Sequence, residues 1–313
     1  MAPAKAFVAG AVLLSALVVL ALSVGTQGFG WGDGGALLLL RAPRVLAALA
    51  AGLALGIGGA AQQGVFRNPL ADPGLTGVFG GALFGIALLL GISPETAWHR
   101  AWCLPAAAFG GALGTSALLA IWGTGGSMAR LLLTGLGLNA FTAAGTLVIA
   151  ARSGESRELL TNGAYGDWLG MATLELIWLP TGLCVLAALA LLSLARPLDL
   201  LAFGEDAARG FGCDVTGARR RAACLTALAA AAATCLVGQV AFIGLLAPHL
   251  ARACVGPRHR LVLPLAALIG AGLLLAADTA GRALWPQAPL SAAAVTAVIG
   301  APLFIWIARS RHG

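Results

Sequence analysis

Charged residues are scarce in this chain of 313 amino acids. Only 10% of its residues are Asp, Glu, Lys or Arg, against about 25% in an ordinary globular domain, and 59% are apolar. This shortage excludes a soluble globular protein, because the apolar runs are too long for a soluble fold. The net charge of +7 alone would suit a nucleic-acid-binding protein, but the 19 Lys and Arg lie between apolar runs, so we expect no nucleic-acid partner.

Patterns typical of metal sites and of catalysis are also missing. The six cysteines form no C-x-x-C pair and lie mostly inside apolar segments, as small buried hydrophobes do. The four histidines fall at segment ends or in loops, and neither an H-E-x-x-H helix nor a nucleophile motif occurs. The sequence therefore predicts no metal ligand, no cofactor held by this chain and no catalytic residue, which disfavours a membrane-embedded enzyme.

What the chain has in quantity is long apolar runs. A bilayer core about 30 Å thick needs about 20 apolar residues per helix. Ten candidate runs lie near residues 6–24, 44–66, 74–92, 102–122, 131–151, 174–195, 222–241, 242–255, 261–281 and 289–308. The first run is too long for the apolar region of a signal peptide, so we expect a retained helix. The eighth contains Pro248, which predicts a broken or tilted helix.

These runs predict an all-α polytopic membrane protein with a single transmembrane domain over residues 1–313. With ten spans both termini lie on one side of the membrane. Placing them in the cytoplasm leaves thirteen Lys and Arg inside and six outside, in keeping with the positive-inside rule. The loop at about 196–221 contributes most to this excess, so we expect it and both termini to be cytoplasmic.

Two polar stretches interrupt the first half of the chain. Arg41-Ala-Pro-Arg44 stands at the outer start of the second run. Its arginines either snorkel to the interface or form a basic docking site for an acidic partner. Residues 66–75 contain two prolines that forbid a continuous helix, so this stretch is either a simple turn or a gate that lines an aqueous path.

Two further polar stretches follow in the second half. Residues 204–214 have the pattern of a short helix, in which Glu205 and Arg209 can pair and the following glycines suit a C-cap. Such a helix either orders the loop or is moved by a soluble cytoplasmic partner. Residues 238–282 include Asp278, one helical turn before Arg282, and this spacing favours a local ion pair over a proton relay.

These stretches contain a series of short motifs in a fixed order. The motifs are Arg41-Ala-Pro-Arg44, Gln63 with Asn68-Pro69-Leu70-Ala71-Asp72-Pro73-Gly74, Leu131-Leu132-Leu133-Thr134-Gly135, Gly204-Glu205 with Ala208-Arg209, Phe242-Ile243-Gly244-Leu245 with Pro248-His249, and Gly300-Ala301-Pro302. Over nearly the whole chain this series resembles the permease family of ABC importers for iron siderophores, haem and cobalamin, which includes the membrane subunit of the vitamin B12 importer.

The resemblance implies an assembly in a bacterial inner membrane. Two copies of the chain, with ten helices each, would form a homodimer in the lipid bilayer with the translocation path at its interface. Two ATP-binding cassette subunits would lie beneath the homodimer, and a periplasmic substrate-binding protein above it. ATP and Mg would be held by the ATPase subunits, so this chain is expected not to be an enzyme itself. The implied mechanism is alternating access.

The resemblance also implies roles for individual residues. The docking residues for the binding protein would be Arg41, Arg44 and Arg282, which favours docking over snorkelling. The cytoplasmic gates would be formed by Asn68, Leu70, Ser127 and Met128, although Met128 replaces an expected small polar residue. The helix that couples the chain to the ATPase would present Glu205, Asp206, Ala207, Ala208, Arg209 and Phe211. Its apolar contact would come from Ala207, Ala208 and Phe211.

The cargo is the least constrained of these expectations. Residues 66–75 most resemble family members assigned to haem, so haem or another iron or metal chelate is expected, with a ferric siderophore or cobalamin as alternatives. A different class of protein, an ion-coupled secondary transporter, needs several deep ionisable residues or paired inverted repeats. The sequence has one deep acid and no clear inverted repeat.

Overall fold

The computed structural model describes residues 3–25, 28–29, 36–72, 74, 77–92, 103–123, 128–152, 168–284 and 289–309. Most of these residues are helical. Two short strands, β1 (Val24–Gly25) and β2 (Gly28–Phe29), pair antiparallel. The long helices are α1 (Pro3–Ser23), α2 (Ala36–Phe66), α3 (Val78–Ile92), α4 (Cys103–Gly123), α5 (Met128–Arg152), α7 (Leu174–Leu192), α10 (Val215–Val237), α11 (Ile243–Val255), α12 (His259–Leu284) and α13 (Ala292–Arg309). The short ones are η2 (Trp168–Met171), α8 (Ala195–Leu201) and α9 (Glu205–Gly210).

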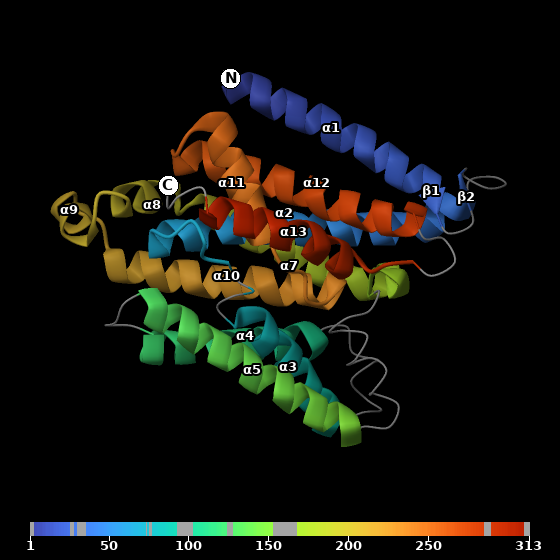
Figure 1. Ribbon diagram of the computed structural model, residues 1–313, viewed down its shortest axis with the longest axis horizontal. Coiled ribbons are helices and arrows are strands. Elements are labelled where there is room, and N and C mark those ends of the chain that lie inside the picture. Colours follow the sequence, from blue (N-terminus) through green and yellow to red (C-terminus); the bar gives the residue numbers. More distant parts are fainter. Residues whose placement is uncertain are drawn as a thin grey trace.

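The long helices match the ten apolar runs in order. Within the described residues, six helices are long and apolar enough to cross a membrane, and four shorter apolar helices accompany them. The expected all-α polytopic fold is therefore confirmed. Figure 1 places α9 and the β1–β2 pair at opposite ends of the bundle, and α1 begins and α13 ends towards the α9 end.

Two helices begin earlier than their apolar runs predict. Helix α2 starts at Ala36, so Arg41 and Arg44 lie inside it and not at its start, where they are expected. Pro43 has no N–H, so the helix lacks one hydrogen bond, the one to the carbonyl of Leu39. The helix tolerates this loss because Pro43 lies near its start. Helix α10 starts at Val215, since the carboxylate of Asp214 caps it by accepting the N–H of Gly217 at 2.9 Å.

Helix α11 is continuous through Pro248, so the expected break is wrong. Pro248 has no N–H to donate to the carbonyl of Gly244, four residues earlier. The side-chain amide of Gln63 on α2 donates to that carbonyl instead, at 3.3 Å. The carbonyl oxygen of the same amide accepts a hydrogen bond from Arg252. A side chain from another helix thus replaces the hydrogen bond that the proline removes.

We expect Gln63→Leu to destabilise the protein by about 1–3 kcal/mol, because the buried carbonyl of Gly244 then loses this donor. Thermal unfolding in detergent measures the effect. Gln63→Glu separates the two contacts of this side chain, since it keeps an acceptor for Arg252 but has no N–H for Gly244, so we expect it to be destabilised as well. Equal stability of wild type and the Leu variant would contradict this role of Gln63.

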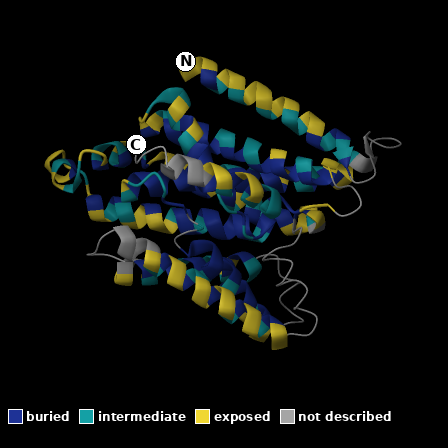
Figure 2. Cartoon of the chain, in the orientation of Figure 1, coloured by how far each residue is buried: buried dark blue, intermediate teal, exposed yellow. Residues whose placement is uncertain are grey.

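Helices α2 and α12 form the centre of the bundle. A Cβ atom added at Gly52, Gly56 or Gly270 would collide with the backbone of the facing helix, so these two helices touch along their backbones. Another close approach joins α2 to α11, where a Cβ at Gly59 would meet the backbone of Gly244. The buried residues concentrate along this centre, whereas α1 and α5 turn exposed faces outwards (Figure 2).

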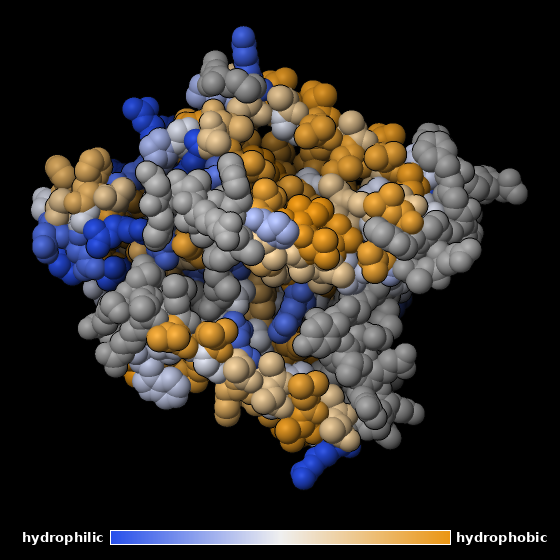
Figure 3. Space-filling model, viewed as in Figure 1, coloured by the Kyte–Doolittle hydropathy of each residue, from blue (hydrophilic) through white to orange (hydrophobic). Residues whose placement is uncertain are grey.

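The outer surface divides by polarity. Hydrophilic side chains gather at the α9 end, on the left of Figure 3, and hydrophobic ones cover much of the rest of this face. Large exposed apolar side chains lie on α1, α5, α7 and α13, among them Leu13, Phe141, Trp178 and Val298. A soluble protein rarely exposes so much apolar surface, so these faces suit lipid or another membrane-embedded chain.

Candidate functional site

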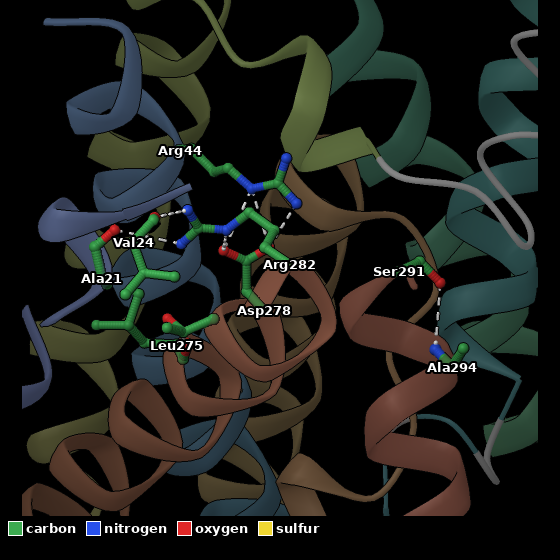
Figure 4. A network of polar contacts seen from close by, with 9 residues as sticks. Ala21, Val24, Arg44, Leu275, Asp278, Arg282, Ser291 and Ala294 are labelled. Atoms are coloured by element: carbon green, nitrogen blue, oxygen red, sulfur yellow. Dashed lines mark hydrogen bonds and ion pairs between the residues drawn. The ribbon is translucent and has the colours of Figure 1, made fainter. Parts of the chain in front are cut away.

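A buried ionic cluster lies at the β1–β2 end (Figure 4). Asp278 of α12 is fully buried and receives two arginines. Arg44 of α2 binds it through Nη2 at 2.7 Å and Nε at 3.0 Å, and Arg282 of α12 binds it through Nε at 3.1 Å. The expected local pair of Asp278 and Arg282 is confirmed. Its second partner, Arg44, is 234 residues away in the sequence.

The arginines of this cluster also hold the end of α1. Arg282 donates to the carbonyl of Val24 at 2.6 Å, and Arg41 donates to the carbonyl of Leu22 at 2.9 Å. The last carbonyls of a helix have no partner within it, so Arg41 satisfies one that α1 leaves open at Leu22, and Arg282 binds the carbonyl of Val24 just after the helix. Arg41 is only 8% exposed and bonded inside the chain, so the snorkelling alternative is wrong for it.

The structure therefore brings together the three arginines that the sequence singled out. Arg41, Arg44 and Arg282 carry three positive charges beside the single negative charge of Asp278. Their direct contacts are internal, and their docking role stays a prediction. Sequence reasoning missed that Asp278 also binds Arg44, because the pattern shows only partners on the same helix.

The expected gate stretch begins at the end of α2. Arg67 takes a left-handed conformation (φ 48°), and the N–H of Asn68 donates to the carbonyl of Gln63 at 3.1 Å. These features end α2 in a Schellman motif. The side chain of Asn68 accepts the N–H of Leu70 at 3.0 Å, which forms a tight turn.

The two expected gates differ in what the structure describes. Asn68 and Leu70 lie together in the turn after α2, and Leu70 packs against the cluster of Leu245 and Leu246. Ser127 lies outside the described residues, and of Met128 only its place at the start of α5 is described. Gating by any of these residues stays a prediction.

A cavity of about 650 Å³ lies beside this turn. Its walls come from Asp72 and Gly74, from α3, α5 and α13, and from the segment 239–242 with the start of α11. They are mostly apolar, including Phe79 and Phe242. Asn139 of α5 lines it and donates to the carbonyl of Gly74 at 2.7 Å. The volume falls in the range of small-molecule sites. Among the described residues no three His, Cys, Asp or Glu gather to hold a metal ion. The wall offers apolar contact, the amides of Asn139 and Gln239, and the carboxylate of Asp72.

Sequence reasoning missed the polar residues of this cavity. Asn139 lies within the apolar run 131–151 and Gln239 near the end of the run 222–241, and both line the cavity. A polar side chain inside a predicted span is the signal that could have identified Asn139, since such groups usually face the interior of a bundle.

The expected coupling helix is present as α9. Glu205 pairs with Arg209 at 3.0 Å, as its spacing predicted, and also with Arg219 of α10 at 2.6 Å. The helix ends in a second Schellman motif with Gly212 in the left-handed region (φ 77°), which confirms the expected glycine cap. These contacts attach the charged helix to α10 at the end of the bundle.

One expected contact of α9 is wrong. Ala208 is fully buried and packs within the chain among the core residues that include Leu198 and Leu201 of α8, so it offers no surface to a partner. The exposed apolar side chains nearby are Phe211, at 68%, and Phe203, at 76%. Sequence reasoning missed Phe203, although a large apolar residue beside Gly204 in a polar loop is a usable signal.

The arrangement is that of a polytopic membrane protein with a charged helix at one end, a cluster of arginines at the other and an apolar cavity along the bundle. A sequence profile of the FecCD transport family matches residues 6–310. The chain belongs to this family.

Similar proteins extend the comparison. The hemin transport system permease protein HmuU of Yersinia pestis is 38% identical over 283 residues, which cover 86% of this chain and 82% of HmuU. The iron(3+)-hydroxamate import system permease protein FhuB of Escherichia coli is 36% identical over an alignment that covers 97% of this chain but only 46% of FhuB. A solved structure of a metal-chelate type ABC transporter, in an inward-facing conformation, is 27% identical with a TM-score of 0.85 and covers 98% of this chain and 99% of that one.

Proposed function

We propose that this chain is the permease subunit of an ATP-driven importer that moves haem or another metal chelate across a bacterial inner membrane by alternating access. Membership of the FecCD transport family and the similarity to the hemin permease support this proposal. The main structural support is helix α9, where exposed charged and aromatic side chains lie next to a buried residue that packs against the core.

Helix α9 has the features that a contact with a soluble motor needs. Its outer surface has charged residues and is flanked by Phe203 and Phe211, while Ala208 anchors its inner face against α8. Because this attachment is packed, a displacement of α9 has to move α8 with it. The loop 196–221 is rich in arginine, so the positive-inside rule supports a cytoplasmic location for the α9 end and both termini.

The proposed assembly is a homodimer with two ATP-binding cassette subunits, which hold ATP and Mg, and a periplasmic substrate-binding protein. FhuB supports the need for two permease units, since this chain spans less than half of FhuB and the remainder is long enough for a second unit. The exposed apolar faces of α5 and α13 flank the cavity and suit contact with a second copy or with lipid. The cargo path would then run between the two copies.

The arginine cluster is the proposed docking site for the binding protein. Three guanidinium groups beside one carboxylate leave an excess of positive charge, which attracts an acidic surface over roughly one Debye length, about 10 Å at 0.1 M salt. We expect the double variant Arg41→Glu, Arg44→Glu to weaken capture of the binding protein.

The expected loss is at least tenfold in affinity at low salt and smaller at high salt. Titration of the binding protein against the permease complex at several salt concentrations measures it. The salt series is the control, because loss of the internal contacts of Arg41 to Leu22 and of Arg44 to Asp278 would weaken capture to a similar extent at every salt concentration. Unchanged affinity at low salt would remove these arginines from the docking site.

Uptake by the complete complex in vesicles tests the function and the cargo together. We expect ATP to drive accumulation of haem when the binding protein is present, and a non-hydrolysable analogue to allow at most one turnover. Uptake of a ferric siderophore or of cobalamin, with haem excluded, would retain the importer and correct its cargo. No ATP-driven uptake of any of the three would contradict the proposal.

A further inference from the structure

The helix that carries α9 is attached to α12 by a polar contact outside the core. Asp199 of α8 accepts the backbone N–H of His259, the first residue of α12, at 2.8 Å. The same oxygen lies 2.8 Å from Nδ1 of the His259 ring. The first N–H groups of a helix lack partners within it, and a negative charge there is favourable, so Asp199 caps α12 from another helix.

Helix α8 connects α9 to this contact, because it packs with α9 and also carries Asp199. Leu198 and Leu201, on either side of Asp199, are buried in the same core as Ala208 of α9. The connection between α8 and α9 is short, and it turns at Gly204 in the left-handed region (φ 105°). Packing on one face and the carboxylate on the other thus leave α8 little freedom to move independently of α12.

Helix α12 continues to the opposite end of the bundle (Figure 1). Asp278 follows His259 by 19 residues, which corresponds to roughly 29 Å along a helix. Over this length α12 lies against α2 with backbone contact at Gly52, Gly56 and Gly270. At its far end Asp278 binds Arg44 and Arg282, and Arg282 also binds the carbonyls of Ala21 in α1 and of Val24 just after it.

We propose that Asp199 is a positioning residue that joins the coupling helix to α12, so that a displacement of α9 changes the arginine cluster where the binding protein docks. The inference rests on the proposed function. It differs from a purely structural cap, for which loss of Asp199 would weaken folding and leave the communication between the two ends intact.

The test measures the linkage between nucleotide and binding protein. The complete complex in nanodiscs is titrated with binding protein without nucleotide and with ATP, using a hydrolysis-deficient ATPase subunit. The ratio of the two affinities reports the coupling, and such ratios typically lie between about 5 and 150. For Asp199→Ala we expect a ratio within about twofold of one, with an affinity in the absence of nucleotide that matches wild type.

Three further variants make the result specific. Asp199→Asn keeps an oxygen that accepts the N–H of His259, so we expect it to retain most of the wild-type ratio. Glu175→Ala removes an exposed acid at the start of α7 and should leave the ratio unchanged. If Asp199→Ala fails to assemble, His259→Ala is used in its place. This variant keeps the hydrogen bond from the backbone N–H of residue 259 to Asp199 and removes only the ring contact. We expect its affinity ratio to fall at least threefold.

The outcomes separate this inference from the function on which it rests. A full nucleotide effect in Asp199→Ala, or in His259→Ala where the first variant does not assemble, would overturn the role of Asp199 alone. A wild-type complex whose affinity for the binding protein ignores nucleotide altogether would overturn the coupling in the proposed function. Loss of the ratio in Asp199→Ala with its retention in Asp199→Asn and Glu175→Ala would support the inference.

Discussion

Replacing Phe211 with Asp is expected to abolish ATP-driven uptake while the permease stays folded. Phe211 follows α9 directly and is 68% exposed, so the substitution removes little packing and changes folding stability only slightly. A charge in an apolar contact surface weakens binding strongly, by about 2 kcal/mol or more for a central aromatic residue, which corresponds to roughly thirtyfold in affinity. Uptake by vesicles and binding of the ATPase subunit both measure the effect.

Phe211→Leu is the matched control, because it keeps an apolar side chain at the same position and should retain most of the uptake. Ala208→Asp is unsuitable as a coupling variant, even though the sequence suggests it. It would place a charge in a fully buried position and disturb the attachment of α9 itself. Normal uptake by Phe211→Asp would show that α9 receives no force from a partner through this side chain.

Removing Asp278 is expected to have the largest effect on stability. Asp278→Ala leaves Arg44 and Arg282 in a largely buried site without their shared counter-ion. Breaking a buried ion pair by deleting one partner typically costs about 3–5 kcal/mol, because an uncompensated charge remains. Thermal or denaturant unfolding of the purified protein in detergent measures the loss.

A combined variant tests the cause of this loss. Replacing the three ion-paired residues, with Asp278→Leu, Arg44→Leu and Arg282→Met, removes both ion pairs together, and apolar replacement of buried ion clusters is often neutral or stabilising. We therefore expect the triple variant to unfold at a higher temperature than Asp278→Ala. A triple variant less stable than the single one would mean that the arginine contacts to α1 matter more than the charge of Asp278.

The sequence predicted the helices well because their signal is local. A long apolar run in a membrane generally forms an α-helix, because the helix satisfies its own backbone hydrogen bonds. The ten runs accordingly correspond to ten helices in the expected order. The ends of helices were harder to place. Pro43 stands where a helix is expected to begin, yet α2 starts seven residues earlier, and the apolar helix formers at 36–40 are the signal that could have indicated it.

The site was predictable only where its partners lie within one or two helical turns. The pairing of Glu205 with Arg209 and the glycine cap of α9 follow from spacing, and both are present. The contact of Gln63 with Gly244 joins residues 181 positions apart, and the contact of Asp199 with His259 joins residues 60 apart. Which side chains meet at such separations is decided by helix packing, which a single sequence does not encode in any local pattern.

The burial of Ala208 could not be predicted either, because it too depends on residues far away in the sequence. Its neighbours in the sequence are polar and charged, so the pattern predicts an exposed helix with small apolar residues available for a partner. The core beneath α9 comes from α8 and from distant helices, and only the tertiary structure reveals that Ala208 fills it. The identity of the cargo could not be predicted from these residues, because mostly apolar cavity walls discriminate weakly among large metal complexes.

The measurement that tests the central claim most directly is nucleotide dependence of uptake in sealed vesicles. The permease is reconstituted with its ATPase subunit and binding protein, and cargo uptake is followed with ATP, without nucleotide, and with the permease alone. We predict accumulation only with ATP and all three components. Equal accumulation by the permease alone, with no nucleotide present, would contradict the claim that a partner drives transport through α9.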